Sequence, residues 1–320
     1  TAEGALTEVH SMLQRMNELA VQASNGTNSS TDRQAIQDEI SQLTTEIDRV
    51  AETTKFNESY LLKGDNAKTK NVYMEGHDAG LKGTLTDNST SATFTVKGGD
   101  LDAGKSVTIG GKEYTIGATV DEGKKMLGTT YDGSVKAKVN GVEYTLVADG
   151  DHDPDAKKLK KSEMEKLIVA GATVEVGGKS ATVLTDANSD GIDDNDSSVI
   201  TAAKAVELMT TELTAANNIG TVDKAATVAA GAAYDATNGV TFTITKGYAT
   251  VADKLSFNLH VGSDADMTNK ITVEIETMSA KNLGIKGLNV ADETGLGATY
   301  AVDAIADAVQ KVSEQRSALG

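Results

Sequence analysis

Residues 13–50 read LQRMNELAVQASNGTNSSTDRQAIQDEISQLTTEIDRV, and this stretch decides the fold. It predicts two helices, because apolar residues recur at alternating spacings of three and four and so line one face of a helix. The first apolar seam consists of Leu6, Val9, Leu13, Met16 and Ala20, and the second of Ile36, Ile40, Leu43, Ile47 and Val50. Sustained seams of this kind are typical of coiled coils and helical bundles.

A polar turn at residues 24–30 separates the two helices. Its Gly and Asn residues favour the end of the first helix, and Ser30 or Thr31 can cap the second, with Gln34 completing a capping box after Thr31. The two helices are therefore expected to fold back as an antiparallel hairpin.

A third seam lies at the other end of the chain. It predicts one helix from about residue 299 to residue 320, with Arg316 interrupting the pattern. Its apolar members are Val302, Ile305, Val309, Val312 and Leu319. Because the three seams can bury one another, the segment between them is expected to leave the bundle and return to it.

The first helix is apolar over more than one seam. Met12, Leu19 and Ala23 lie beside the main stripe. A face this wide indicates more than one packing partner, one within the subunit and another in a neighbouring subunit.

The centre of the chain contains a weak internal repeat. Residues 106–116, 136–146 and 173–183 align without gaps, each as a strand, a two-residue turn and a strand. The turns are Gly-Gly, Asn-Gly and Gly-Gly, which supply the positive φ angles that tight hairpins require. Helices are expected after the hairpins, at residues 121–127, 155–169 and 198–215. These ββα units predict one or two α+β subdomains.

Further strands are expected before the last helix. Residues 240–251 predict a hairpin turning at Lys246-Gly247, and residues 255–261 and 270–276 predict two strands joined by a polar turn at 262–267. The second pair is expected to pack on the helical hairpin. The predicted fold class is thus α+β, with a discontinuous helical-bundle core at 1–67 and 253–320 and a variable α+β insert at 68–252, as one or two subdomains.

Composition excludes several classes of protein. The 320 residues carry a formal charge of −17, which argues against nucleic acid or an anionic membrane surface as a partner. Cysteine is absent, so disulfides and thiolate chemistry are excluded. No HExxH, G-x-S-x-G or phosphate-binding glycine motif occurs, and nothing in the sequence predicts an enzyme.

An Asp-rich loop, DANSDGIDDNDS at residues 186–197, is the strongest chemical pattern. Oxygen-bearing side chains hold the first, third, fifth and ninth positions of a calcium loop, and these are Asp186, Asn188, Asp190 and Asp194. Gly191 holds the sixth position, but the twelfth lacks the bidentate Glu. The alternative is an Asp/Asn/Gly-rich loop that caps the following helix. Calcium is the only cofactor that the sequence suggests.

Both ends of the chain resemble bacterial flagellin. The resemblance is carried by QRMNELAVQASN at 14–25, DRQAIQDEISQLTTEIDRVAETTKFN at 32–57, LHVGSDADMTNKITVEIETMSAKNLGI at 259–285 and AVDAIADAVQKVSEQRSALG at 301–320. The segment between shows no comparable resemblance. Flagellins carry further terminal helices that form the inner tube of the filament, so this sequence resembles a trimmed core without them.

The resemblance implies a structural subunit of the extracellular flagellar filament, acting in motility and exported through the flagellar channel. It implies as partners other flagellin subunits in a homopolymer, an export chaperone and cap, and a host Toll-like receptor. The positions that match the receptor-recognised segment are Gln14, Arg15, Glu18, Leu19, Gln22 and Glu39, with Asn17 where many flagellins have Arg. The alternative is an Arg15–Glu18 surface pair beside a Leu packed inside or between subunits.

Two other functions are compatible with the sequence. A hook-filament junction protein would share the bundle, although the QRMNELAVQ segment is close to flagellin itself. A calcium-binding, adhesin-like module would instead place the function in the insert.

Overall fold

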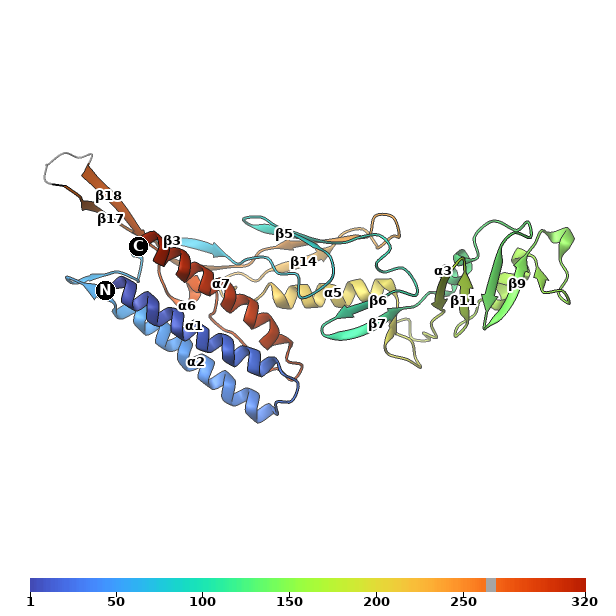
Figure 1. The fold of residues 1–320 in the computed structure, drawn as a ribbon, viewed down its shortest axis with the longest axis horizontal. Helices are drawn as coiled ribbons and strands as arrows, with labels where there is room; N and C mark the ends of the chain where they lie inside the picture. Colours follow the sequence, from blue (N-terminus) through green and yellow to red (C-terminus); the bar gives the residue numbers. More distant parts are fainter. Residues whose placement is uncertain (263–268) are drawn as a thin grey trace.

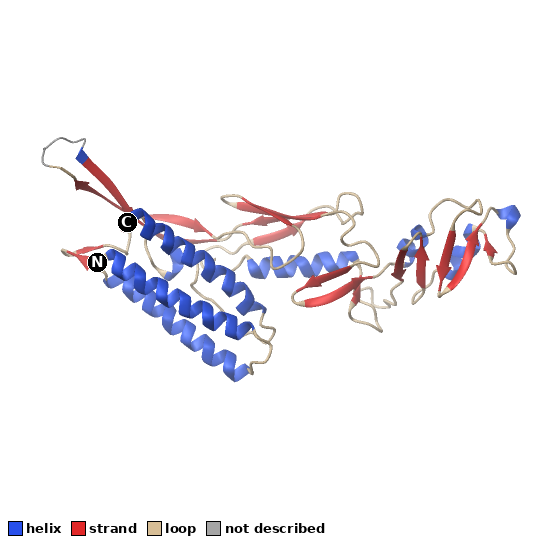
Figure 2. Ribbon diagram, viewed as in Figure 1, coloured by secondary structure: helices blue, strands red, loops and turns tan. Residues whose placement is uncertain are grey.

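The computed structural model describes residues 1–262 and 269–320 of the chain. It is an elongated molecule in which three long helices lie at one end and a small sheet lies at the other (Figure 1). The long helices are α1 (Ala2–Ser24), α2 (Ser30–Thr53) and α7 (Leu296–Leu319). Helices dominate the first end, and strands dominate the rest (Figure 2). The expected α+β fold is confirmed.

The bundle core joins the two ends of the chain. The first seam is confirmed in full, because Leu6, Val9, Leu13, Met16 and Ala20 are each 0% exposed. Ile40 and Ile305 belong to the same apolar cluster. On α7, however, the centre of the buried face consists of Ala301, Ala304, Ile305, Ala308 and Val312, whereas Val302 and Val309 pack at its edge. Alanines allow close approach of helix backbones, a preference that a search for large apolar residues does not detect.

The cap of α2 differs from the expectation. The N-cap is Ser29, whose hydroxyl accepts a hydrogen bond from the backbone N–H of Asp32, while the Asp32 carboxylate accepts one from the backbone N–H of Ser29. The capping box is therefore closed by Asp32 instead of Gln34. The shorter acidic side chain also places a negative charge in the first turn, where the helix dipole favours it.

A short antiparallel pair follows α2, and it consists of β1 (Lys55–Phe56) and β2 (Ser59–Tyr60). The bundle is then connected to the insert by β3 (Asp65–Tyr73) and β16 (Tyr248–Asp253), which pair antiparallel. The expected hairpin at residues 240–251 is wrong. Although β15 (Val240–Thr245) and β16 are separated only by Lys246 and Gly247, β15 pairs with strands of another sheet. Lys246 is buried and forms an ion pair with Asp87, so the chain crosses between sheets there instead of turning back.

The part of the insert nearer the bundle packs around one helix, α5 (Ala202–Ala216). One sheet has the order β14-β15-β5-β4, with β14 at Thr227–Ala230, β5 at Ser91–Val96 and β4 at Thr84–Asp87. A second has the order β13-β7-β6, with β13 at Val199–Ile200, β7 at Lys112–Ile116 and β6 at Ser106–Ile109. Phe94 and Phe242 are the largest fully buried side chains of this cluster.

The far end of the insert is a five-stranded sheet with its own apolar cluster. Its order is β10-β9-β8-β11-β12, with β10 at Lys158–Leu159, β9 at Val142–Leu146, β8 at Lys136–Val139, β11 at Thr173–Val176 and β12 at Lys179–Thr182. Helices α3 (Val120–Met126) and α4 (Lys161–Leu167) and the 3-10 turn η1 (Asp149–Asp151) complete it. The two cores are separate, and Tyr300 of α7 belongs to the nearer one.

The three predicted two-residue turns are confirmed. They are Gly110-Gly111, Asn140-Gly141 and Gly177-Gly178, and all six residues have positive φ. Each hairpin is followed along the chain by a helix, as the ββα pattern predicts. The second helix begins later than expected, because Lys158 and Leu159 pair parallel with β9 and cannot also be helical. The third begins at Ala202, with Thr201 as its cap.

A last hairpin precedes the short helix α6 (Ala280–Leu283). It consists of β17 (Leu255–His260) and β18 (Lys270–Ile275), and most of the turn predicted between them falls at residues 263–268, outside the described residues. This hairpin projects from the bundle near the two chain ends (Figure 1). Both strands contact the bundle core as expected, through Phe257, Val273 and Ile275, but Leu259 and Ile271 near the tip are about half exposed. A six-residue strand is about 20 Å long and extends past the end of the helices.

Candidate functional site

The β17–β18 hairpin carries an apolar stripe that runs from the core to open solvent. Phe257 faces Val273 and Leu259 faces Ile271 across the two strands. Ile275 at the base is 1% exposed, whereas Leu259 and Ile271 near the tip are 49% and 54% exposed. A two-stranded hairpin with one bare apolar face is marginal in water. The stripe therefore has the character of a surface that a partner covers.

Two aromatic side chains add to the exposed apolar surface at this end of the bundle. Phe56 and Tyr60, on the β1–β2 turn, are 58% and 44% exposed. The ammonium groups of Lys55 and Lys63 lie 5.9 and 5.1 Å from the centre of the Tyr60 ring. Aromatic rings bordered by cations are common at protein–protein interfaces. No pattern in the sequence indicates that Phe56 and Tyr60 face solvent.

A groove of about 500 Å³ lies along the bundle between α1 and α7. It is lined by Gln14, Asn17, Glu18, Ile305, Ala306 and Val309. Its walls combine amide and carboxylate groups from α1 with aliphatic groups from α7. This mixture suits another protein surface better than a small, fully buried ligand.

Beside the groove, Arg15 joins α1 to α2. Its Nε donates to Glu39 Oε1 at 2.9 Å, and its Nη1 lies 3.4 Å from Glu18 Oε2. The hydrogen bond that Arg15 donates to Glu39 and the charge of that carboxylate raise the pKa of Arg15, and Glu18 adds to the effect. The guanidinium is thus held in place while half of the side chain remains exposed.

The structure separates Leu19 from the other residues of the predicted receptor patch. Gln14, Arg15, Glu18 and Gln22 are exposed and Glu39 is half-buried, but Leu19 is only 2% exposed and belongs to the bundle core. Four residues along a helix advance the side chain by about 40° beyond a full turn. That offset is enough to carry Leu19 from the exposed face of α1 to the buried one.

The Asp-rich loop uses its oxygen atoms for its own backbone. The Asp186 carboxylate accepts from the N–H groups of Asp190 and Gly191, and the Asp194 carboxylate accepts from that of Ala187. The Asp190 side chain accepts from Ile192 N–H and from the Asn188 amide. These hydrogen bonds hold the loop in its turn, and each carboxylate keeps further lone pairs, so calcium binding by Asp186, Asn188, Asp190 and Asp194 stays a prediction. Helix α5 is capped by Thr201 and not by these carboxylates.

Two further features concern the described part of the chain, namely metal sites and membrane-spanning helices. Within residues 1–262 and 269–320, no group of three or more His, Asp or Glu side chains is placed to hold a metal ion. In the same residues, no helix has the length and apolar character needed to cross a membrane.

These features define a class of protein: an elongated α+β subunit whose two chain ends form one helical bundle, with apolar surface left open at the end of that bundle. Residues 1–67 match the family model for the bacterial flagellin N-terminal helical region. The N-terminal part of the chain is thus similar to that of bacterial flagellins, and the curated proteins that match the chain over longer stretches are flagellins as well.

Two curated flagellins show the extent of this similarity. The chain is 49% identical over 121 residues to a flagellin of Clostridium tyrobutyricum, a match covering 37% of this chain and 32% of the relative. It is 34% identical over 221 residues to a flagellin of Salmonella budapest, covering 60% and 43%. The chain thus spans less than half the length of these relatives.

Among solved structures, FliC from Burkholderia pseudomallei aligns over 100% of this chain and 95% of its own, at 20% identity and a TM-score of 0.35. FlgL from Xanthomonas campestris aligns over 99% and 83%, at 15% identity and a TM-score of 0.30. Neither TM-score is high enough to define a shared fold, so the similarity to flagellins depends on the sequence matches.

Proposed function

We propose that this chain is a structural, non-enzymatic subunit of the extracellular bacterial flagellar filament, where it self-assembles and serves motility. The observation that carries the proposal is the apolar stripe of β17–β18, which leaves the bundle core and continues into solvent. The similarity of residues 1–67 to the flagellin N-terminal helical region, and of longer stretches to curated flagellins, supports it. In this role, copies stack lengthwise, and the inserted sheets project from the stack.

The stacking contact joins the hairpin of one copy to the bundle of the next. Leu259, Val261 and Ile271 supply the apolar side. Because each is already about half-buried, complete burial adds roughly 1 kcal/mol per side chain, about half of the value for a fully exposed one. The groove between α1 and α7 supplies a matching surface with apolar walls on α7. Apolar burial of this kind does not depend on charge and so withstands changes of salt outside the cell.

The test compares two faces of the hairpin. Replacing both Leu259 and Ile271 with Ser is expected to abolish concentration-dependent association in sedimentation velocity, and to abolish filaments seen by electron microscopy of the full-length parent protein. The control is Thr272→Ser, on the opposite face, which retains the hydroxyl that donates to Asn258. Normal filaments from the double variant would refute the stacking contact. A parent protein that never polymerises would refute the filament role.

We propose further that the exposed residues of α1 and α2, namely Gln14, Arg15, Glu18, Gln22 and Glu39, form a surface recognised by the Toll-like receptor that senses flagellin. The support is an exposed arginine already fixed by Glu39, since a pre-positioned arginine loses little freedom on binding. Arg15→Ala should weaken receptor binding roughly tenfold or more in a surface plasmon resonance assay.

The matched control for Arg15 is Arg49→Ala. Arg49 is exposed on α2 and pairs with Glu46, as Arg15 pairs with Glu18, but it lies outside the patch. Its replacement should leave receptor affinity unchanged. Equal affinity of the parent and Arg15→Ala would contradict the surface. Leu19→Ala is expected to act through the stability of the core and not through a direct receptor contact.

We also propose the division of the chain into a bundle at 1–67 and 253–320 and an insert at 68–252. It is supported by an apolar cluster that contains residues from both chain ends and by two further clusters made almost entirely of insert residues. Limited proteolysis should release an insert fragment with ends near these boundaries.

A further inference from the structure

Helix α7 presents a second face, which the bundle does not use. Tyr300, Asp303, Asp307 and Lys311 are spaced by three and four residues, so they lie along one side of the helix. Ile305 and Ala308, by contrast, lie in the bundle core. Tyr300 belongs to the apolar cluster of the insert, and its hydroxyl donates to Glu212 of α5 at 2.5 Å. The polar face of α7 is therefore where the insert meets the bundle.

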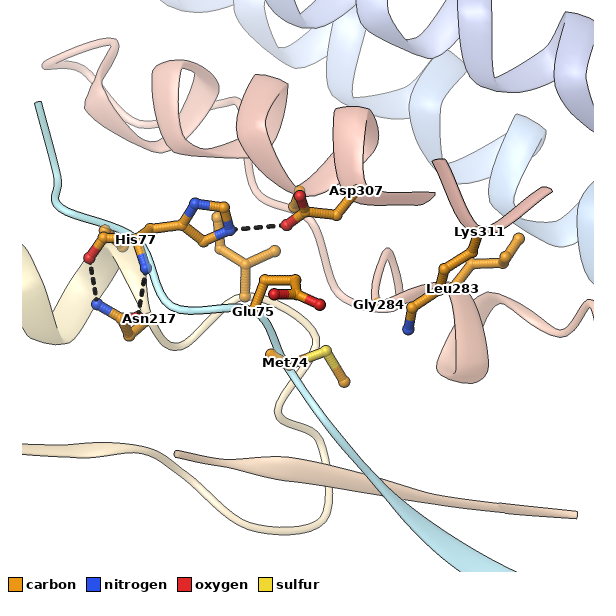
Figure 3. Close-up of a pocket in the computed structure, with 11 residues that line it drawn as sticks. Met74, Glu75, His77, Asn217, Leu283, Gly284, Asp307 and Lys311 are labelled. Carbon is orange, nitrogen blue, oxygen red and sulfur yellow. Dashed lines mark hydrogen bonds and ion pairs between the residues drawn. The ribbon is translucent and has the colours of Figure 1, made fainter. Parts of the chain in front are cut away.

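His77 is the second contact between the insert and α7. It lies on the segment that leaves β3 and enters the insert, and its Nε2 is 2.8 Å from Asp307 Oδ2 (Figure 3). The backbone of His77 is held as well: its N–H donates to Asn217 Oδ1 at 3.0 Å, and Asn217 Nδ2 donates to its carbonyl at 2.9 Å. Asn217 is the C-cap of α5. His77 therefore connects its own segment both to the end of α5, through its backbone, and to α7, through its side chain.

The joint is closely packed. The His77 side chain is 21% exposed and that of Asp307 is 33% exposed. The cavity beside them, lined in part by Met74, Leu283 and Gly284, measures about 20 Å³, which is room for about one water molecule. With so little free space, a weakened contact cannot be replaced by local repacking and must instead be relieved by movement of the parts it joins.

We propose that the His77–Asp307 pair is a proton-dependent lock that fixes the insert against α7. With the imidazole protonated, a charge-assisted hydrogen bond ties the linking segment to the bundle helix. With the imidazole neutral, the charge assistance is lost, and the insert is held to the bundle by the Tyr300–Glu212 hydrogen bond and by the ion pairs Lys70–Glu276 and Lys281–Asp223. The lock is a property of this joint and does not depend on the filament role.

The charges around the ring favour its protonated form. Burial of the ring lowers the pKa of His77, but the hydrogen bond and charge of Asp307, with Asp303 and Asp87, outweigh it and raise the pKa above its ordinary value. A raised pKa of a base means that its stabilisation is complete below pH 6.5 and is lost as pH rises through the folded-state pKa. The lock is thus closed in mildly acidic solution and opens on the alkaline side of 6.5.

Three other titratable side chains at the joint have shifted pKa values. Glu75 has its pKa raised by the hydrogen bond with Asp87 and by burial, whereas the pKa of Asp87 is lowered because Lys246 and other donors outweigh burial. Burial lowers the pKa of Lys311, whose ammonium donates to Asn282 O. Among the side chains at this joint, the imidazole of His77 is the one whose ordinary pKa lies nearest neutral pH.

The experiment uses the absence of cysteine from the chain. Cysteines introduced at Gln42 of α2 and Ser89 of the β4–β5 turn, both exposed, carry spin labels on the bundle and on the insert. Double electron–electron resonance at pH 6 and pH 8.5 is expected to show a narrow distance distribution at the lower pH and a distribution at least twice as wide at the higher one. His77→Gln should give the wide distribution at both values.

Controls separate the lock from general pH effects. His152→Gln, in the far sheet, should retain the full response. Asp307→Asn should remove the response and return the pKa of His77, followed by nuclear magnetic resonance, toward 6.5. Circular dichroism verifies that each variant is folded. An unchanged distribution between the two pH values in the parent, or a response that survives in folded His77→Gln or Asp307→Asn, would overturn the proposal.

Discussion

The bundle and the insert bury apolar surface in different ways. The bundle core draws on both ends of the chain, so residues some 300 positions apart must meet before it is complete. The far cluster of the insert, in contrast, is made from residues 120–183, which are close in sequence. Local contacts form at a lower entropic cost than distant ones. The insert's far end can therefore hold its structure independently, whereas the bundle is stable only as a whole.

The largest expected effect comes from the bundle core. Leu13→Ala removes a fully buried side chain and should lower the free energy of unfolding by about 2–5 kcal/mol. Because α1, α2 and α7 share this core, all three helices should lose amide protection together in hydrogen exchange. Met164→Ala is the counterpart in the far cluster and should reduce protection in β8, β9 and β11 alone. Equal loss in both regions would show that the two cores unfold as one.

A second comparison concerns the hairpin turns of the insert. Gly141→Ala places a Cβ on a residue with φ of +80° and should cost roughly 1–2 kcal/mol. Gly150→Ala, where φ is not positive and no atom lies within 4 Å of the added Cβ, is the control. Thermal unfolding followed at the far sheet should separate the two variants, and identical midpoints would exclude the turn as a source of stability.

A smaller effect is expected at the caps of helices. Ser29→Ala removes the hydroxyl that receives the Asp32 N–H and should destabilise the bundle by about 1 kcal/mol. Thr119→Ala removes the same contact from α3 in the insert, which is only seven residues long. Ser29→Ala should lower the free energy of unfolding measured with urea. Thr119→Ala should instead speed hydrogen exchange at the Glu122 amide without changing the global free energy of unfolding. Global destabilisation by Thr119→Ala would contradict the independence of the far sheet.

The smallest effect concerns Tyr234, within the nearer core of the insert. Burial and the hydrogen bond to Asp102 raise its pKa to about 12, against the opposing effect of the Leu101 and Gly99 amides. The neutral phenol is therefore favoured in the folded state, and stability should fall as pH rises from 10 through about 12. Tyr234→Phe should remove this part of the decline in unfolding free energy with pH, and it should lower the unfolding free energy near neutral pH by about 0.5–1.5 kcal/mol. Chemical unfolding at several pH values measures both quantities. An unchanged decline between pH 10 and about 12 would exclude Tyr234 as its source.

Much of the fold followed from sequence periodicity. The seams on α1 and α2, the three two-residue turns and the order of hairpins and helices in the insert all depend on near neighbours, whose spacing is visible in the chain. The strand pairing predicted from the sequence is wrong where a distant segment competes with a neighbouring one for the same strand. Residues 240–251 look like a hairpin in isolation, but β15 and β16 find partners at residues 91–96 and 65–73.

The candidate surfaces were only partly predictable. The spacing of Arg15 and Glu18 indicated their pair, but the sequence could not show that Leu19 turns into the core. The Asp-rich loop had the composition of a calcium site, yet its carboxylates are directed at backbone N–H groups. Composition identifies the available ligands, whereas only backbone geometry determines where they point.

By itself, the sequence determined that the two chain ends would associate, because three apolar seams are removed from water most completely by packing against one another. It also determined the tight turns, because positive φ angles favour glycine and asparagine. The tertiary structure alone decided that the β17–β18 stripe extends beyond the bundle and that His77 reaches Asp307 across 230 positions. Such contacts depend on the lengths and angles of whole elements, which no local pattern of residues encodes.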